Sequence, residues 1–557
     1  MLITLLAWIY ITFLSWMWGI LFLQIIKRIT KTDLLVPHFS IICMTGLSAI
    51  TIIAGTLSLV MALGSWWVQF FFIAPCLVLF FKKNKPYFFA TVKKEFSNLH
   101  IVSTILLVAC LLLILVMSTW TIVHDDTLGY HAQTIQWIEK YKAVPGLVHL
   151  HVRLGYQGLW FVDCALFSFS FTGKEGITFS NSTILLWFFI FLINRINFNF
   201  FNQGNKIYGL LWIALFMVCM SSYTQVRLTA TSASPDFIAT LLVLAIVYIL
   251  FQRSSFDNWL LLAFLSLAAT TIKLSVAPIL LIVLAAFIIF IRTRKFKLLF
   301  TLIILSAIAF LPFITRNIIT SGYIVFPSTA IDITNVDWKY NAELTANEKN
   351  YITAYAKRPG VVTKEEIDEV NRLSPIEWLP GWWQNRSIAD KTIIVLFILS
   401  VLAALLSIKK LIQSDFRSIL ILLTLLAGII FWFKNAPDPR FGFGFMLGFI
   451  AVAAYVFFKE KEIPIAKNVL IALLLVSTTS IVAYTGYRFI NFFSKDQLLI
   501  PLGIDKTDYK TVDCEGIKIN TPVDGKDFGM TPIPCTDLDC ENFSPKGNKI
   551  ADGFKSR

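Results

Sequence analysis

The residue types best suited to chemistry lie together in one short polar stretch, His124-Asp125-Asp126-Thr127-Leu128-Gly129-Tyr130-His131. A carboxylate beside an imidazole or a phenol is suited to general acid–base catalysis, and adjacent carboxylates are suited to binding a divalent metal ion. We therefore expect Asp126 or Asp125 to act as a base, or both to hold Mg²⁺ or Mn²⁺ if the reaction needs one. Tyr130 and His131 are expected beside the substrate. The alternative for either aspartate alone is that it only caps a helix.

A second polar group, His149-Leu150-His151 followed by Arg153, comes shortly afterwards. Two histidines that alternate on a strand point the same way and can bind zinc. No cysteine or further clear ligand set accompanies them. Hydrogen bonding to a substrate by His151 and Arg153, or a structural role in the loop, is therefore favoured over zinc binding.

Four further cations lie close to apolar runs: Arg227, Lys273, Arg316 and Arg440. Charges this close to hydrocarbon are costly and are usually kept for function, and pairing with phosphate is a natural use for them. The competing interpretation is that each side chain reaches out to lipid headgroups. We expect these four residues to bind an anionic substrate.

The elements that position these side chains begin with a helix. The pattern predicts that it starts at one of the two aspartates and is broken by Pro145-Gly146. Asp126, Tyr130, Gln133 and Trp137 follow one another at intervals of four, three and four residues, so we expect them to share one face.

The composition places the chain in the membrane class. Of 557 residues, 57% are hydrophobic and 15% are charged, and the mean hydropathy is +0.72. The formal charge of +14 resides in short loops between apolar runs, which is typical of cytoplasmic loops and argues against a nucleic-acid partner.

The apolar runs predict an all-α polytopic membrane protein with about fourteen transmembrane helices, extracytoplasmic loops and juxtamembrane helices. These spans are expected near residues 2–26, 39–62, 66–81, 101–119, 178–194, 207–221, 236–251, 258–271, 275–291, 298–314, 391–408, 418–433, 442–458 and 468–485.

The basic loops predict the orientation. Clusters such as those at residues 82–94, 292–297 and 459–467 all fall on one side if both termini are extracytoplasmic. This holds only if the apolar run Gly155 to Phe171 does not span, so we expect it to be a juxtamembrane or re-entrant helix near the outer interface. The site residues then gather outside, with helical segments at 343–357 and 364–373 in the largest outer loop.

Three regions are expected: accessory helices at 1–100, a transmembrane core at 101–486 with outer loops at 120–177 and 315–390, and a small extracytoplasmic tail at 487–557. The tail holds Cys514, Cys535 and Cys540, so a disulfide is expected there, although the sequence does not select the pair.

Several motifs in this order resemble a known group. They are Asp126-Thr127-Leu128-Gly129-Tyr130-His131, Val144-Pro145-Gly146-Leu147 with His151, Arg153-Leu154-Gly155, Arg316-Asn317 with Ser321-Gly322-Tyr323, Val336-Asp337-Trp338-Lys339, and Pro437-Asp438-Pro439-Arg440-Phe441. Over residues 101–460 the chain resembles a family of uncharacterised bacterial membrane proteins related to the GT-C superfamily of polytopic glycosyltransferases. That superfamily commonly has an Asp-Glu or Glu-Asp pair, so Asp125-Asp126 is a mild departure.

The resemblance implies a cell-envelope glycosyltransferase of the bacterial cytoplasmic (inner) membrane. The donor would be a polyprenyl-phosphate sugar, and the acceptor an extracytoplasmic glycan, lipid or protein attacking the anomeric carbon with inversion. In this hypothesis Asp126 or Asp125 deprotonates the acceptor, while Lys273, Arg316 and Arg440 neutralise the leaving phosphate.

Two alternatives are a second kind of enzyme and a protein of another class, a transporter. A polysaccharide polymerase or ligase would also use a large outer loop with basic residues. A lipid-linked glycan transporter or flippase would line a pathway with the same charges. Transporters usually carry repeats and place polar groups at mid-membrane. Neither feature is found in this sequence.

Overall fold

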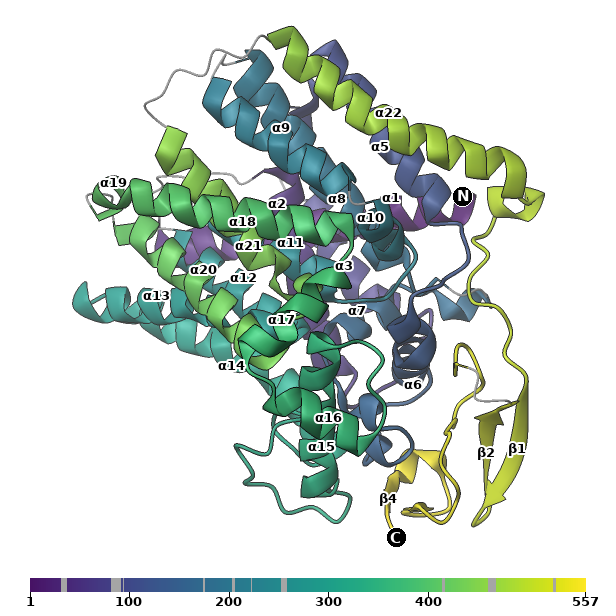
Figure 1. Cartoon of the computed structure of the whole chain (residues 1–557). Coiled ribbons are helices and arrows are strands. Elements are labelled where there is room, and N and C mark those ends of the chain that lie inside the picture. The colour runs from purple at the N-terminus through teal and green to yellow at the C-terminus, as the bar shows by residue number, and fades with distance from the viewer. Residues whose placement is uncertain are drawn as a thin grey trace.

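Apolar helices account for most of the molecule. The computed structural model describes residues 1–31, 38–81, 92–93, 95–173, 176–202, 206–221, 223–251, 258–412, 416–458, 467–523 and 527–557. Within these ranges, nine helices are long and apolar enough to cross a membrane. The chain is therefore a mostly helical, multi-pass membrane protein (Figure 1).

The longer apolar helices are α1 (Leu2–Thr30), α2 (Phe39–Leu57), α8 (Phe179–Ile196), α13 (Leu281–Arg292, directly after the 3-10 helix η7, Leu274–Leu280), α14 (Phe296–Ser321), α18 (Ile388–Leu406), α20 (Phe416–Asn435), α21 (Pro439–Phe458) and α22 (Lys467–Phe492). The shorter ones are α3 (Val68–Phe81), α5 (Ile101–Met117), α7 (Trp160–Leu166), α9 (Lys206–Ser221), α11 (Asp236–Phe251) and α12 (Trp259–Ile272).

Each of the fourteen expected spans coincides with one of these helices, and α7 is the additional one. Nine of these fourteen helices are long enough to span a membrane, whereas the other five are apolar helices of only 10–17 residues. The count of fourteen therefore remains a prediction.

The first two helices pack closely because small residues face one another at their crossing. A Cβ atom on Gly46 would lie 1.7 Å from the carbonyl oxygen of Ser15, and one on Gly19 would lie 2.0 Å from that of Ile42. Small residues at a helix crossing allow the two backbones to approach, which is how helices associate without a hydrophobic driving force between them.

The segment excluded from the spans forms only a short helix, α7, which is buried inside the protein. Asp163 lies at its centre with no exposed surface, and Thr51 of α2 donates a hydrogen bond of 2.9 Å to its carboxylate. The non-helical residues before α7 and its seven-residue length are incompatible with a membrane crossing.

The polar elements lie together at one end of the bundle (Figure 1). They include α6 (Ala132–Lys140), α10 (Tyr223–Ala230), α15 (Ala342–Lys357), α16 (Lys364–Arg372) and α17 (Pro375–Gln384); a further short helix is α19 (Ile408–Ile412). The two helical segments predicted in the largest loop are present as α15 and α16. Thr363 and Glu366 form a reciprocal capping box at the start of α16.

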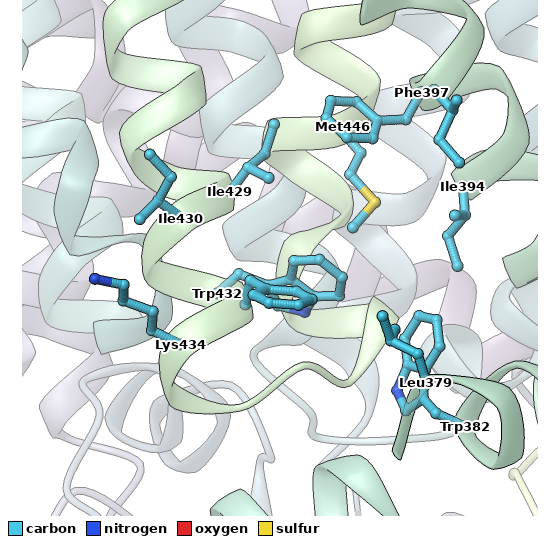
Figure 2. Close-up of a pocket in the computed structure, with 11 residues that line it drawn as sticks. Leu379, Trp382, Ile394, Phe397, Ile429, Ile430, Trp432, Lys434 and Met446 are labelled. Carbon is cyan, nitrogen blue, oxygen red and sulfur yellow. The ribbon is translucent and has the colours of Figure 1, made fainter. Parts of the chain in front are cut away.

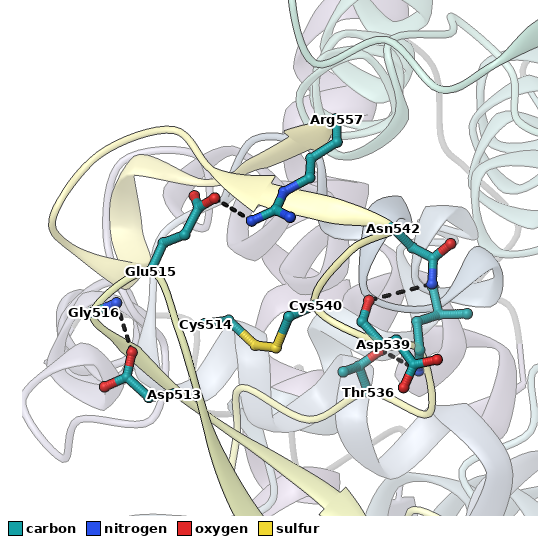
Figure 3. Close-up of a disulfide and its surroundings, with 10 residues drawn as sticks. Asp513, Cys514, Glu515, Gly516, Thr536, Asp539, Cys540, Asn542 and Arg557 are labelled. Atoms are coloured by element: carbon teal, nitrogen blue, oxygen red, sulfur yellow. Dashed lines mark hydrogen bonds and ion pairs between the residues drawn. A yellow bond between two sulfur atoms is a disulfide. The ribbon is translucent and has the colours of Figure 1, made fainter.

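The tail contains two antiparallel hairpins, β1 (Tyr509–Cys514) with β2 (Ile517–Pro522), and β3 (Phe543–Pro545) with β4 (Phe554–Ser556). A disulfide joins Cys514 to Cys540 (Figure 3), and Cys535 is free and buried. This identifies the pair that the sequence left open.

The tail packs against the segment 137–154, which follows the motif, and is not a separate appendage. Phe543 and Phe554 share a buried cluster with Trp137 and Leu150. The close approach of the backbone of Phe554 to that of residue 146 requires a glycine at position 146. There φ is +67°, and a Cβ atom would lie 1.9 Å from the carbonyl oxygen of Phe554.

Both ends of the helical bundle meet beside the tail. The amino group of Met1 donates a hydrogen bond of 2.6 Å to the carbonyl oxygen of Gln497. The two termini of the helical part are therefore close in space, whichever side of the membrane they occupy. Three of the basic loops used to predict the orientation, at 82–91, 252–257 and 459–466, lie outside the described residues.

Candidate functional site

The motif segment folds as a helical turn whose cap comes from a histidine. Nδ1 of His124 accepts a hydrogen bond of 3.2 Å from the backbone N–H of Thr127. The chain then forms a π-helical turn, η1 (Thr127–His131), before continuing as α6. Asp126 makes no capping hydrogen bond, so the prediction that an aspartate caps this helix is wrong for Asp126. Its carboxylate is left for other partners.

Those partners are two arginines from distant parts of the chain. Nη1 of Arg153 lies 3.2 Å from Oδ1 of Asp126, and Nη1 of Arg440 lies 3.0 Å from Oδ2. The three side chains are 23–29% exposed. Burial would raise the pKa of Asp126, but the positive charges, that of Arg440 foremost, lower it well below its ordinary value. The carboxylate is ionised at neutral pH.

Arg440 extends the network towards the membrane helices. Its Nε atom lies 3.5 Å from Asp236, at the start of α11, and 3.6 Å from Asp438. Lys273, at the end of α12, forms an ion pair with Asp236, and its Nζ atom lies 3.9 Å from the ring centroid of Phe441. Residues from four separate segments therefore meet around one guanidinium.

On the opposite side of Asp126, Arg153 connects the site to the long loop at 315–390. Nε of Arg153 lies 3.8 Å from Glu348 of α15, and Tyr156 donates a hydrogen bond of 2.7 Å to the same carboxylate. The guanidinium also lies 5.5 Å from the ring of Tyr130 and 5.7 Å from that of Tyr351. Helix α15 thus closes one side of the site.

Positive and negative charges are balanced in this network. The acids are Asp126, Asp236, Asp438 and Glu348, and the bases are Arg153, Lys273, Arg440 and Arg386, the last of which lies 3.8 Å from Asp438. An incoming anion must therefore exchange with a carboxylate to reach a cation.

The two histidines of the motif are neutral hydrogen-bonding groups. Nδ1 of His124 and Nδ1 of His131 each lie 3.1 Å from the hydroxyl of Thr127. Burial lowers the pKa of His131 to about 3 and also lowers that of His124. The ring of Tyr130 packs against His131 with centroids 4.4 Å apart.

Two hollows adjoin the network. The smaller one is a cavity of about 60 Å³ that includes His124, Ser232, Asp236 and Arg440 in its lining. The larger one is an open apolar groove of about 470 Å³ between α17, α18, α20 and α21 (Figure 2). Among the described residues that line it, Lys434 is the one with a charge.

The groove ends at the turn 436–438, which directly precedes helix α21 and its second residue, Arg440. Trp382 and Trp432 line it (Figure 2), and their indole N–H groups donate hydrogen bonds of 2.9 and 2.6 Å to the carbonyl oxygens of Pro437 and Asp438. An apolar surface within the bundle and the ionic network therefore adjoin through one short turn.

Other predicted site residues lie elsewhere. Arg316 is only 2% exposed and donates to Gln157 at 3.1 and 2.7 Å and to Ser58 at 2.7 Å, so it ties α14 to α2 and does not face the network. Asp125 is exposed. Arg227 lies 5.6 Å from the ring of Trp120.

The histidine pair does not converge on one point. His149 lies 3.0 Å from the carbonyl oxygen of Trp338. His151 packs against Phe528 with ring centroids 5.1 Å apart, and burial lowers its pKa to about 4. His151 is therefore neighbour to the tail and not to Asp126.

The aspartates do not fit a divalent cation in this arrangement. Both oxygens of Asp126 accept hydrogen bonds from guanidinium groups, and two neighbouring positive charges oppose a metal ion. In the described part of the chain, no group of three or more His, Cys, Asp or Glu side chains is arranged to hold a metal. We therefore derive no step through a metal.

Sequence reasoning missed Asp236 and Glu348. Asp236 directly precedes an apolar run, and an acid next to hydrocarbon is the signal that could have identified it. Glu348 is one of two acids in helix α15, and no local signal distinguishes it from Glu343.

Comparison with known proteins gives one family match. A family model described as "Domain of unknown function (DUF8201)" matches residues 1–447. No curated protein and no solved structure matches the chain.

Proposed function

This chain belongs to the DUF8201 family of unknown function, and from its site we propose a membrane glycosyltransferase of the GT-C type. It transfers a sugar from a polyprenyl-phosphate donor to an extracytoplasmic acceptor. In this proposal all fourteen apolar helices span the membrane, both termini are outside, and the protein resides in the bacterial cytoplasmic membrane.

The observation that carries the proposal is the position of the ionic network beside the apolar groove. A polyprenyl-phosphate sugar has a long apolar chain, one phosphate and a polar sugar. The groove suits the apolar chain, and the turn at its end leads into α21, where Arg440 is the second residue and Lys273 is close by. Asp126 and Tyr130 then lie on the side that is left for the sugar and the acceptor.

Because the charges are balanced, donor binding must rearrange them. The donor phosphate takes Arg440 and Lys273 from Asp126 and Asp236, since phosphate oxygens form strong charge-assisted hydrogen bonds with both cations. Loss of a neighbouring positive charge raises the pKa of Asp126. The carboxylate becomes a stronger base only when the donor is present, which protects the donor from premature reaction.

The chemical step is a displacement at the anomeric carbon. The acceptor oxygen forms a bond to that carbon while the bond to the phosphate oxygen breaks, and the electron pair leaves with polyprenyl phosphate. The acceptor proton passes to Asp126, or to the exposed Asp125, and the cations stabilise the charge that develops on the phosphate.

The test is to analyse envelope glycans in a strain that lacks the protein and carries plasmid-borne variants. Wild type restores a missing sugar branch, and the double variant Asp125→Asn with Asp126→Asn does not, although it accumulates to the same level in the membrane. Each single variant then identifies the base.

Other glycan phenotypes separate the alternatives. Shorter polymers in the deletion strain indicate a polymerase or ligase, and lipid-linked intermediates trapped in the cytoplasm indicate a flippase. Full restoration by the double variant contradicts the proposal.

A further inference from the structure

Two arginines that form none of the ion pairs around Asp126 lie over the ring of one tryptophan. The guanidinium carbon of Arg227 lies 5.6 Å from the ring of Trp120, and that of Arg488 lies 5.0 Å from the same ring. Trp120 is buried and lies four residues before His124, the first residue of the motif segment. Arg227 comes from α10 and Arg488 from α22, so distant elements converge here.

Among the described residues, nothing compensates the charge of these two cations. Each Nε atom is buried and has no hydrogen-bond acceptor. Across the ranges that the structure covers, no carboxylate lies within ion-pair distance of either guanidinium. Two like charges on one aromatic ring repel each other, and cation–π contacts offset only part of that cost. The arrangement is that of a site for an anion.

The surroundings indicate which kind of anion. Ile490 and Phe492, on the same helix as Arg488, are 81% and 65% exposed. Large apolar side chains exposed beside a cation are typical of contact with lipid. Free solutes have no reason to select such a surface, whereas an amphiphile with a phosphate headgroup does.

The site is also connected to the ionic network. Leu228 and Thr229, which directly follow Arg227, line the small cavity that Asp236 and Arg440 also line. We propose that Arg227 and Arg488, with Trp120 between them, bind the phosphate of a membrane lipid as a second anion site at the rim of the candidate active site. Its existence does not depend on the proposed transfer reaction.

The test is native mass spectrometry of the full-length protein in detergent, with phosphatidylglycerol or phosphatidylcholine titrated. Wild type binds one phosphatidylglycerol at least about tenfold more tightly than phosphatidylcholine. Both lipids carry a phosphate, but the choline cation of phosphatidylcholine repels the two guanidinium groups. Arg227→Gln with Arg488→Gln removes this preference. The matched control, Arg292→Gln with Arg294→Gln on exposed residues at the end of α13, retains it.

A second measurement uses the wild-type protein alone, in case the double variant fails to fold. Phosphatidylglycerol protects Arg227 and Arg488 from modification by phenylglyoxal, as read from the peptides, whereas inorganic phosphate does not. Equal affinity for the two lipids or no protection overturns the proposal. Displacement of the lipid by inorganic phosphate overturns the assignment to a lipid. Neither readout requires catalysis, so failure here and failure of the glycosyltransferase proposal are distinguishable.

Discussion

At the scale of single residues, Asp126 holds the site together because each of its oxygens meets a different guanidinium. Removing one partner of a partly buried ion pair is costly, since it leaves the remaining charges uncompensated. Its neighbour Asp125 is exposed and has no ion pair in the described part of the chain.

We therefore predict that Asp126→Asn lowers the free energy of unfolding by about 1–3 kcal/mol, reduced from the fully buried case because the pair is partly exposed. Asp125→Asn is the matched control and should change it by less than about 0.5 kcal/mol. Thermal unfolding in detergent at pH 7 measures both. Equal effects of the two substitutions are incompatible with the role of Asp126 as the centre of the network.

His131 makes stability depend on pH. Burial lowers its pKa to about 3, whereas an unfolded histidine has a pKa of about 6.5. Between these values the unfolded chain binds a proton that the folded chain does not, so stability is complete above about pH 6.5 and falls as the pH drops.

We predict that His131→Gln weakens this loss of stability between pH 7 and pH 5. Gln keeps a hydrogen-bonding group for Thr127 but does not titrate. The slope of the unfolding free energy against pH, measured by thermal or chemical unfolding at a series of pH values, checks this. An unchanged slope shows that other groups, such as His151, account for the dependence.

At the scale of elements, Arg316 shows how a cation can be structural. It connects α14 to Ser58 at the end of α2 and to Gln157. We predict that Arg316→Met destabilises the fold by about 1–3 kcal/mol, because buried acceptors lose their donor. Arg294→Met, on an exposed residue, should be neutral in the same thermal assay. If the Arg316→Met protein is as stable as wild type, the hydrogen bonds from Arg316 to Ser58 and Gln157 do not stabilise the packing of these elements.

Several elements followed from local patterns in the sequence. Apolar runs located all the long helices, and turn residues located α15 and α16. The distribution of basic loops indicated that the apolar run around α7 does not span the membrane. The burial of α7 inside the protein agrees with this.

The contacts that build the site could not be predicted in the same way. Asp126 and Arg440 are 314 positions apart, and no local pattern reports such a pair. The tail is polar, so the sequence predicts an appendage, yet Thr531 accepts a hydrogen bond from Gln133 and the ring of Phe554 packs against Trp137. The sequence predicts that Arg316 is a binding cation, because no local pattern reveals that its partners are the uncharged residues Gln157 and Ser58.

At the scale of the whole molecule, the polar elements at one end of the bundle carry the site (Figure 1). We predict that this end is extracytoplasmic. A membrane-impermeant maleimide on intact cells should label Thr329→Cys in the large loop and not Arg294→Cys at the end of α13. The free native cysteines in the described ranges are buried or partly buried, so background labelling should be low. Labelling of Arg294→Cys without permeabilisation contradicts this orientation.

The central claim is that the network around Asp126 transfers a sugar from a lipid phosphate. The most direct measurement mixes purified protein with a panel of polyprenyl-phosphate sugars and envelope acceptors, and follows release of polyprenyl phosphate. We predict release with wild type and a loss of at least about a hundredfold with Arg440→Gln, since removing a group that stabilises transition-state charge costs about that much. No release from any donor, or equal release by Arg440→Gln, contradicts the claim.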